Sequence, residues 1–419
     1  MRGRSLTIAV MFGMVFMVGF VTMFTGSIGT VVKSQFGASN AMAQLGTAVT
    51  FMSYFFMGIP AGVILKRKGY RFTSLLAVSV GFAGVAIQLG AGWLESFPIY
   101  ILGAFVAGLS MCILNVTANP MMNTLGGGGN GGNRLVQFGC SVNSVGGMSA
   151  PLLLGFLFGN DMSKARVLDA APAQLIALGV FALGFLVVFR AQIPEPHLEK
   201  KVEGVERGMW RDILKVFRFR HFALGALALF FFDPVEAGIP NMANLYLTAE
   251  GTPAYTGAAI AGTLVAGYCG CMMLGRFVAG VIGEKVSARI MIVSGAIACI
   301  VLLVTIVSMP LRMAAVPLIG SVPVSMVLMM LCGACTSVMF GGIFNLATEG
   351  LGRYVPVASG VIMSMVLGGS LLSVQGVIAD RVGILNSYWM TIGLLAYIAW
   401  YAVFGSRVVR RADEGEAGA

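Results

Sequence analysis

Charged residues are scarce in this 419-residue chain, where Asp, Glu, Lys and Arg together make up 11% of the sequence. Soluble globular proteins carry about 25% charged residues. Apolar residues reach 58% here, and the mean hydropathy is +0.89. The chain has two histidines, and neither falls in the middle of an apolar run, so a histidine proton relay is not expected. This composition excludes an ordinary soluble protein and indicates a chain that lies in a lipid bilayer.

Runs of about 20 apolar residues, long enough to cross a bilayer as a helix, recur throughout the chain. Arg2 and Arg4 precede the first run, which reaches spanning length without a cleavage site of small residues. We therefore expect no cleaved signal peptide. We expect twelve spanning helices, at 6–29, 42–65, 72–92, 98–122, 135–159, 170–190, 222–247, 256–283, 288–309, 321–347, 357–379 and 385–404.

The net charge of +10 is unevenly distributed along the chain. If the N-terminus is inside, most basic residues fall in loops on that side, as do Lys66, Arg67, Lys68 and Arg71 after the second run. The positive-inside rule then predicts that both termini are cytoplasmic in the inner (plasma) membrane. Because topology accounts for the charge, the expected partner is the lipid bilayer and not a nucleic acid.

Cysteine and glycine patterns give no sign of redox, metal or nucleotide chemistry. All 7 cysteines fall within the predicted spans, so no disulfide framework is implied. Cys332 and Cys335 have CxxC spacing, which on an apolar helix favours packing over metal binding. The glycine-rich segment 126–132 lacks a following Gly-Lys-Ser/Thr, so we interpret it as a flexible loop and not as a phosphate-binding loop. We expect no cofactor and no metal.

One long polar segment divides the twelve runs into two sets of six. We expect an N-terminal six-helix bundle at 1–190, a cytoplasmic linker at 191–221 and a C-terminal six-helix bundle with a short tail at 222–419. Two such bundles joined by a charged linker are typical of the major facilitator fold, in which each bundle contains inverted three-helix repeats. The predicted fold class is therefore an all-α membrane protein of this architecture.

Amide side chains interrupt two of the apolar runs. Asn115 and Asn119 are four residues apart, which on a helix places them on one face, and Pro120 follows. Asn143 lies between two serines in the next run. Polar groups within a membrane are unfavourable unless they meet partners or line a cavity, so they indicate a substrate path.

Several motifs resemble those of a known group, the fucose–proton symporter family of the major facilitators, which includes glucose/galactose transporters. They are Pro60-Ala61-Gly62, Ala118-Asn119-Pro120, Ser141-Val142-Asn143-Ser144, Val235-Glu236-Ala237-Gly238, Gly275-Arg276-Phe277, and a block that runs from Ser337 through Phe344-Asn345-Leu346 to Gln375-Gly376 and Asp380. The resemblance covers most of the chain and implies a secondary transporter that binds a sugar between its two bundles.

The chain departs from that family at the positions of the acids that carry protons. The resemblance places the family's two proton-carrying acids, in the first and fourth helices, at Thr30 and Asn115 of this chain. Neither side chain titrates usefully. Asn115 is therefore interpreted as a neutral group that binds hydroxyls, and proton coupling is expected elsewhere.

The seventh run contains two acids that offer an alternative proton site. Asp233 and Glu236 flank Pro234 near the middle of the bilayer. Two carboxylates that close together in a low dielectric are not both ionised, so one is expected to hold a proton. The alternative is a structural role, in which they cap helix ends freed by Pro234 or pair with Arg276.

Other candidate substrate-binding residues are chosen because amides offer donors and acceptors together, as hydroxyl-bearing solutes require. Asn241 and Asn244 follow Pro240, where a broken helix would expose backbone groups. Tyr54, with Phe55 and Phe56, has the apolar face that stacks on a sugar ring, although core packing is the alternative. The full set is Asn115, Asn119, Asn143, Tyr54, Asn241, Asn244, Asn345 and Gln375. For each amide the alternative is packing between helices, and the neighbouring Pro120 favours this structural role for Asn119.

These observations predict a monomeric secondary transporter that carries a small polar solute by alternating access. By family resemblance the solute is a monosaccharide. The two acids inside the seventh run predict proton symport through Asp233 and Glu236. Alternatives are a facilitative uniporter, an exporter of drug-like or metabolite compounds, and a receptor that does not transport. An enzyme is not expected, because no predicted span contains a nucleophile–base pair or metal set.

Overall fold

The computed structural model describes residues 2–126, 129–158, 166–191, 213–249, 253–282, 286–316, 320–351 and 354–408. Within these ranges twelve helices are long and apolar enough to span a membrane, which confirms the predicted number. They are Ser5–Phe36, Asn40–Leu65, Arg67–Trp93, Phe97–Met122, Phe138–Phe158, Leu168–Arg190, Arg220–Leu247, Ala258–Ala279, Ala288–Ser308, Val324–Thr348, Gly360–Val382 and Leu385–Gly405.

Helices account for nearly all of the regular structure, because a backbone surrounded by lipid has to satisfy its hydrogen bonds internally. The α-helices are α1 (Arg2–Phe36), α2 (Asn40–Trp93), α3 (Phe97–Leu125), α4 (Gly129–Phe158), α5 (Ala171–Arg190), α7 (Arg220–Leu247), α8 (Ala258–Ile282), α9 (Ala288–Ser308), α10 (Val324–Thr336), α11 (Met339–Thr348), α12 (Val355–Ser364), α13 (Leu372–Val382) and α14 (Tyr388–Trp400). Shorter elements are η1 (Val167–Ala170), η3 (Met365–Leu371), η4 (Leu385–Ser387) and η5 (Tyr401–Gly405).

Some labelled elements do not coincide with single spans. The long α2 contains two spans, separated at Gly69, whose φ of +81° is favourable only for glycine. Conversely, α10 and α11 together form one span, and α12, η3 and α13 form another. The expected break after the second apolar run is therefore present as a sharp bend instead of a loop.

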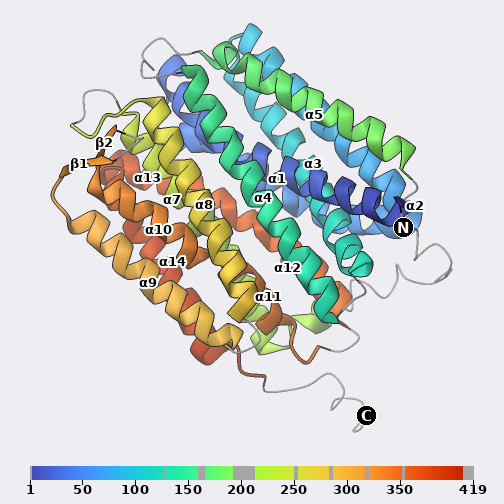
Figure 1. The fold of residues 1–419 in the computed structure, drawn as a ribbon. Coiled ribbons are helices and arrows are strands. Elements are labelled where there is room, and N and C mark those ends of the chain that lie inside the picture. Colours follow the sequence, from blue (N-terminus) through green and yellow to red (C-terminus); the bar gives the residue numbers. More distant parts are fainter. Residues whose placement is uncertain are drawn as a thin grey trace.

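The spans form two bundles, α1–α5 and α7–η5, which lie side by side in Figure 1 (blue to green, and yellow to red). Because the number of spans is even, α1 begins and η5 ends on the same side of the molecule. We call this side the terminal end, and the side where α1 ends and α2 begins the distal end. Most of the predicted linker at 191–221 lies outside the described residues.

Two local expectations differ from the structure. The predicted tenth run began at 321, but β1 (Met313–Val316) and β2 (Gly320–Pro323) form an antiparallel hairpin, and the helix begins at Val324. The glycine-rich segment predicted as a loop ends sooner than expected, because α4 already begins at Gly129. Helix continuation satisfies backbone groups close to a membrane better than a loop does.

The bundles are joined at the distal end by hydrogen bonds between α13 and α2. Asp380, near the end of α13, accepts hydrogen bonds from the backbone N–H groups of Asn40 (2.8 Å) and Ala41 (3.1 Å). These N–H groups have no partner within α2, because the first turn of a helix leaves its donors free. One turn earlier, a Cβ on Gly376 would lie 2.6 Å from the Ala41 Cα, so the two backbones are in close contact.

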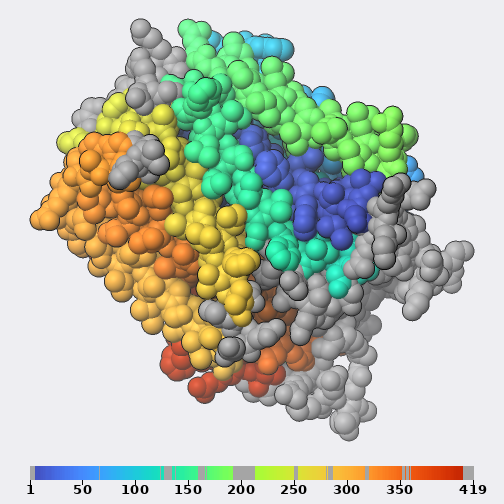
Figure 2. All heavy atoms as spheres, viewed as in Figure 1, coloured from blue at the N-terminus to red at the C-terminus, as the bar shows by residue number. Residues whose placement is uncertain are grey.

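A second seam between the bundles is formed by α4 and α8, which Figure 2 shows packed against each other (green and yellow). Small residues allow this approach: a Cβ on Gly262 of α8 would overlap the backbone oxygen of Pro151 in α4. Nearer the terminal end, Gly270 of α8 also faces α4, but a Cβ there would meet only the Met148 sulfur, at 3.6 Å. The seam is therefore tightest near the distal end, where small residues let the two helix backbones approach closely.

The glycine geometry predicts opposite effects for two substitutions on the same helix face. Gly262→Ala is expected to destabilise the protein by about 1–3 kcal/mol, since a backbone atom cannot move aside easily. Gly270→Ala is expected to be neutral or to stabilise by up to about 1 kcal/mol, because alanine favours the helix. Thermal unfolding of the two variants in detergent measures the difference. Equal melting temperatures would contradict the packing described here.

The outer surface of the bundles is apolar. Large side chains such as Phe156, Leu183, Phe277, Val281 and Ile290 are exposed on the sides of their helices. Apolar patches of this extent are not found on soluble monomers but are expected where lipid chains surround the protein. The protein is therefore a multi-pass membrane protein.

Candidate functional site

A cavity of about 160 Å³ lies between the two bundles. It is at the middle of the spans, because Asp233, which lines it, is at the midpoint of the 28-residue α7. Its polar lining comes from α1, α2, α3, α4, α7 and α8. These polar residues are Thr22, Tyr54, Asn115, Asn119, Asn143, Ser144, Asp233, Glu236 and Arg276.

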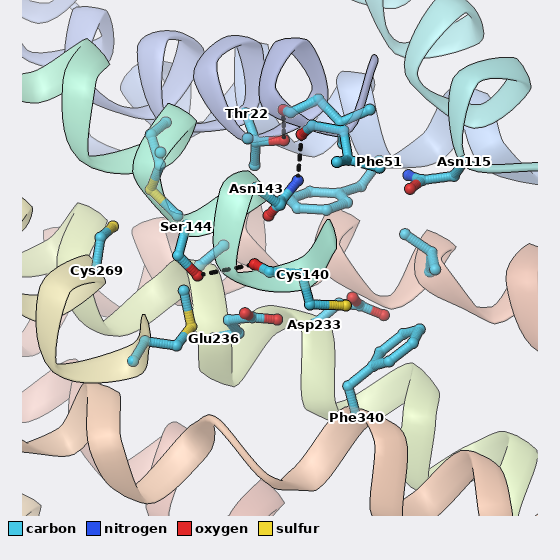
Figure 3. Close-up of a pocket in the computed structure, with 18 of the residues that line it drawn as sticks. Thr22, Phe51, Asn115, Cys140, Asn143, Ser144, Asp233, Glu236, Cys269 and Phe340 are labelled. Atoms are coloured by element: carbon cyan, nitrogen blue, oxygen red, sulfur yellow. Dashed lines mark hydrogen bonds between the residues drawn. The ribbon is translucent and has the colours of Figure 1, made fainter. Parts of the chain in front are cut away.

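The N-terminal bundle supplies the amide side of the cavity. Asn115 and Asn119 both line it, as the four-residue spacing predicted. The Asn115 side-chain nitrogen donates to the Tyr54 hydroxyl at 2.9 Å, so a residue of α3 and one of α2 are held together. Asn143 donates from its side-chain nitrogen to the Val15 carbonyl of α1 at 2.8 Å (Figure 3). This bond leaves the amide oxygen of Asn143 available to accept a bond from a solute.

The C-terminal bundle supplies two carboxylates, whose surroundings differ. The Glu236 carboxylate forms an ion pair with Arg276, with 3.0 Å between Oε1 and the guanidinium nitrogen. Asp233 is only 6% exposed, and its Oδ2 has no hydrogen-bond partner among the described residues. Both carboxylates point into the space below Cys140 in Figure 3. Of the structural alternatives considered for these acids, the pairing with Arg276 is present at Glu236.

Arg276 also contacts the opposite bundle. It donates hydrogen bonds to the Cys140 carbonyl (2.9 Å) and to the Ser144 hydroxyl (2.8 Å), both on α4. The Tyr268 hydroxyl donates to the backbone carbonyl of Glu236 at 3.1 Å. The side chain of Arg276 is 12% exposed, so this cation is almost completely enclosed by its partners.

Four of the predicted substrate-binding residues lie away from this cavity. Asn241 and Asn244 are buried where α7 meets the N-terminal bundle, with side-chain bonds to Gln44 (3.2 Å) and to the Ser27 carbonyl (3.3 Å). Their predicted helix break is wrong, since α7 continues through Pro234 and Pro240. Gln375 bonds to Thr391 within the C-terminal bundle, and Asn345 is exposed at the terminal end.

The aromatic lining also differs in part from expectation. Tyr54 faces the cavity, but Phe55 and Phe56 are 54% and 55% exposed and do not line it. The rings in the cavity are those of Phe51 and Phe340, one from each bundle (Figure 3). Phe51 could have been found from the sequence, because residues three apart share a helix face and Tyr54 was already a candidate.

Other lining residues were not selected from the sequence as site residues. Arg276 was considered only as a structural partner of the two acids. Thr22 and Ser144 have no feature in the sequence that separates them from other threonines and serines in helices. Thr30, where the resemblance places a family acid, is 7% exposed and donates to the Ser27 carbonyl, away from the cavity. The α1 residues that line the cavity are farther toward the terminal end.

Comparison with known proteins supports this architecture. The sequence is 27% identical over 403 residues to a glucose/galactose transporter of Brucella abortus biovar 1 (strain 9-941), which covers 94% of this chain and 92% of the relative. It is 21% identical over 370 residues to the L-fucose-proton symporter of Escherichia coli (strain K12), with 84% and 82% covered.

Solved structures share the fold at low sequence identity. The transporter FucP in the outward conformation has a TM-score of 0.71 at 19% identity, with 97% of this chain and 100% of that chain covered. A D-xylose-proton symporter also has a TM-score of 0.71, at 15% identity, with 97% and 98% covered. The family model of the Major Facilitator Superfamily matches residues 10–374. The chain belongs to the Major Facilitator Superfamily.

Proposed function

We propose that this protein is a secondary transporter that carries a monosaccharide across the membrane by alternating access, coupled to protons. The observation that supports this most is the cavity between the bundles, with amides on one side and a buried carboxylate pair on the other. The sugar-transporting relatives of similar length support the same substrate class. An enzyme is not proposed, since the family consists of transporters.

The dimensions and the lining of the cavity favour a solute of one sugar ring. Its volume of about 160 Å³ is close to the roughly 150 Å³ of an engineered cavity that binds benzene, a six-membered ring. Asn115, Asn119 and Asn143 offer donors and acceptors to hydroxyls, while Phe51 and Phe340 offer apolar ring faces. Asn241, Asn244, Asn345 and Gln375 have no substrate-binding role in this proposal.

Proton coupling is assigned to Asp233 and Glu236. An ionised carboxylate with no partner is unfavourable inside a membrane, so we propose that Asp233 carries the proton. Glu236 forms an ion pair with Arg276 in this structure. We propose that this ion pair breaks when the protein changes conformation. A proton relayed through Asp233 replaces the arginine as the charge partner of Glu236, which links sugar transport to the proton gradient.

The remaining features of the proposal follow from charge and topology. We propose bundles at 1–190 and 222–419 joined by a linker at 191–221, a monomer in the inner membrane, and both termini in the cytoplasm. The distal end is then the outer side, and the bonds from Asp380 to α2 close the cavity on that side.

A facilitative uniporter is the second candidate, and the Glu236–Arg276 ion pair favours it. A carboxylate already neutralised by an arginine does not need a proton to remain buried. Uptake of labelled glucose, galactose, fucose and xylose into proteoliposomes, with and without a pH gradient, separates the two functions. Accumulation that requires the gradient supports symport, equilibration alone indicates uniport, and no uptake of any sugar would reject the proposal.

Two asparagine variants test the assignment of the cavity. Asn119→Ala removes an amide that lines the cavity and has no hydrogen bond to another described side chain. Losing about 1–2 kcal/mol of solute hydrogen bonding predicts a KM for uptake that is raised roughly tenfold. Asn345→Ala, the matched control at an exposed position, is expected to leave the KM within about twofold. A KM raised equally in both variants would contradict the assignment.

A further inference from the structure

Arg276 is the only charged side chain among the described residues of the cavity that bonds to both bundles. Its ion pair with Glu236 lies within the C-terminal bundle, whereas its bonds to the Cys140 carbonyl and to Ser144 cross to α4. When the bundles rock relative to each other, the bond within one bundle can persist, but the crossing bonds have to break. The position of α4 relative to α8 therefore depends on which groups the guanidinium of Arg276 is bonded to.

The link lies on one half of the α4–α8 seam. Arg276 is in the terminal half of α8 and Cys140 in the terminal half of α4, whereas the tight contact of Gly262 with Pro151 is in the distal half. The distal half is held by backbone packing that needs no charge. On the terminal half, the hydrogen bonds that join described residues across the seam are those of Arg276.

We propose that Arg276 acts as a charge-dependent latch between α4 and α8, closed while Glu236 is ionised and released when Glu236 takes up a proton relayed through Asp233. This inference rests on the proton coupling proposed above and adds the residue that converts it into movement. The ionised carboxylate holds the guanidinium in place, aimed at α4. Without that charge, the buried cation lacks its counter-ion and moves toward water, and the two crossing bonds are lost.

The surroundings of Glu236 make this residue the one that controls the latch. Asp233 is one turn away on α7, but no bond joins it to Arg276. Neutral groups cannot replace the lost counter-ion. The titratable and charged groups that face Glu236 are Arg276, Tyr268 and Cys269 on α8, Cys140 on α4 and Asp233 on α7.

The test measures how accessible Cys140 is to N-ethylmaleimide in proteoliposomes, with the native cysteines present and each site quantified by peptide mass spectrometry. Each variant is measured over a range of pH and compared at equal thiolate fraction, because the thiolate is the reacting species and removing a charge near Cys140 changes that fraction. Cys271 is the internal reference, since it is partly exposed on α8 but does not line the cavity.

Glu236→Gln and Arg276→Gln are each expected to raise the alkylation rate of Cys140 about tenfold, as expected for the loss of one charge-assisted hydrogen bond. Ser144→Ala removes one of the two bonds across the seam without leaving a buried charge unpaired, so a smaller rise in the alkylation rate is expected. This variant still tests the proposal if Arg276→Gln does not fold. Asp169→Asn changes an exposed acid in η1 that does not line the cavity, and as the control it is expected to leave the rate unchanged.

Wild-type rates at Cys140 in both Glu236→Gln and Ser144→Ala would overturn the latch, and so would an equal rise in Asp169→Asn. The alkylation measurement needs no substrate, so its outcome does not depend on whether the protein transports a sugar. Sugar uptake by the wild-type protein together with unchanged alkylation would reject only the latch. No sugar uptake together with increased alkylation would reject the substrate and retain the latch.

Discussion

Replacing Asp233 with asparagine is expected to abolish accumulation of sugar against a gradient while leaving exchange of sugar across the membrane intact. Each pH unit supplies about 1.4 kcal/mol per proton, which corresponds to a tenfold concentration ratio. Proteoliposomes with the wild-type protein should therefore approach roughly tenfold accumulation per pH unit if one proton moves with each sugar. With Asp233→Asn the ratio should remain about one, because asparagine has the same shape but binds no proton.

Two controls make this result specific. Asp169→Asn changes an exposed acid in η1, far from the cavity lining, and should retain full accumulation. The double variant Asp233→Asn, Glu236→Gln should still exchange labelled for unlabelled sugar, since neither substitution removes the amides that bind hydroxyls. Undiminished accumulation in the double variant would show that the coupled protons travel through other residues.

Arg276→Gln is expected to lower the free energy of unfolding by about 3–5 kcal/mol, the usual effect of removing one partner from a buried ion pair. The change leaves Glu236 without its counter-ion in a site where its side chain is 20% exposed. Combining it with Glu236→Gln removes both charges, so the double variant should recover most of the lost stability. Thermal and denaturant unfolding in detergent provide the double-mutant cycle.

The matched control for that cycle is Arg312→Gln, because Arg312 is exposed just before β1 and forms no part of the cavity. Its effect should stay within about 0.5 kcal/mol. If Arg276→Gln and Arg312→Gln unfold alike, the ion pair does not contribute to the stability of the site. If the double variant is as unstable as Arg276→Gln alone, the loss comes from packing and not from charge.

Much of the fold was predictable, because span length and apolar composition are dictated by the bilayer. The exceptions have local causes. The bend at Gly69 depends on a φ of +81°, which apolar run lengths do not reveal. In the hairpin of β1 and β2, residues 321–323 of β2 were assigned to the following span, because they continue directly into its apolar run. Proline at 234 and 240 suggested a broken helix, but neighbouring helices stabilise α7 as a continuous one.

The candidate site was predictable only in part, for a geometric reason. Helical spacing correctly grouped Asn115 with Asn119, but it does not tell which face of a helix meets the cavity and which meets another helix. Asn241 and Gln375 are polar for packing reasons, since each bonds to a neighbouring side chain. The role of Arg276 depends on α4, more than a hundred residues away in sequence, and no local pattern contains that information.

The central claim is that sugar and proton move together, and the most direct measurement is the internal pH of proteoliposomes that contain a trapped indicator dye. With no pH gradient at the start, addition of the transported sugar outside should acidify the interior, in proportion to sugar entry. The same preparation with Asp233→Asn should show no pH change. Sugar entry into wild-type proteoliposomes at constant internal pH would contradict proton symport and leave facilitated diffusion as the function.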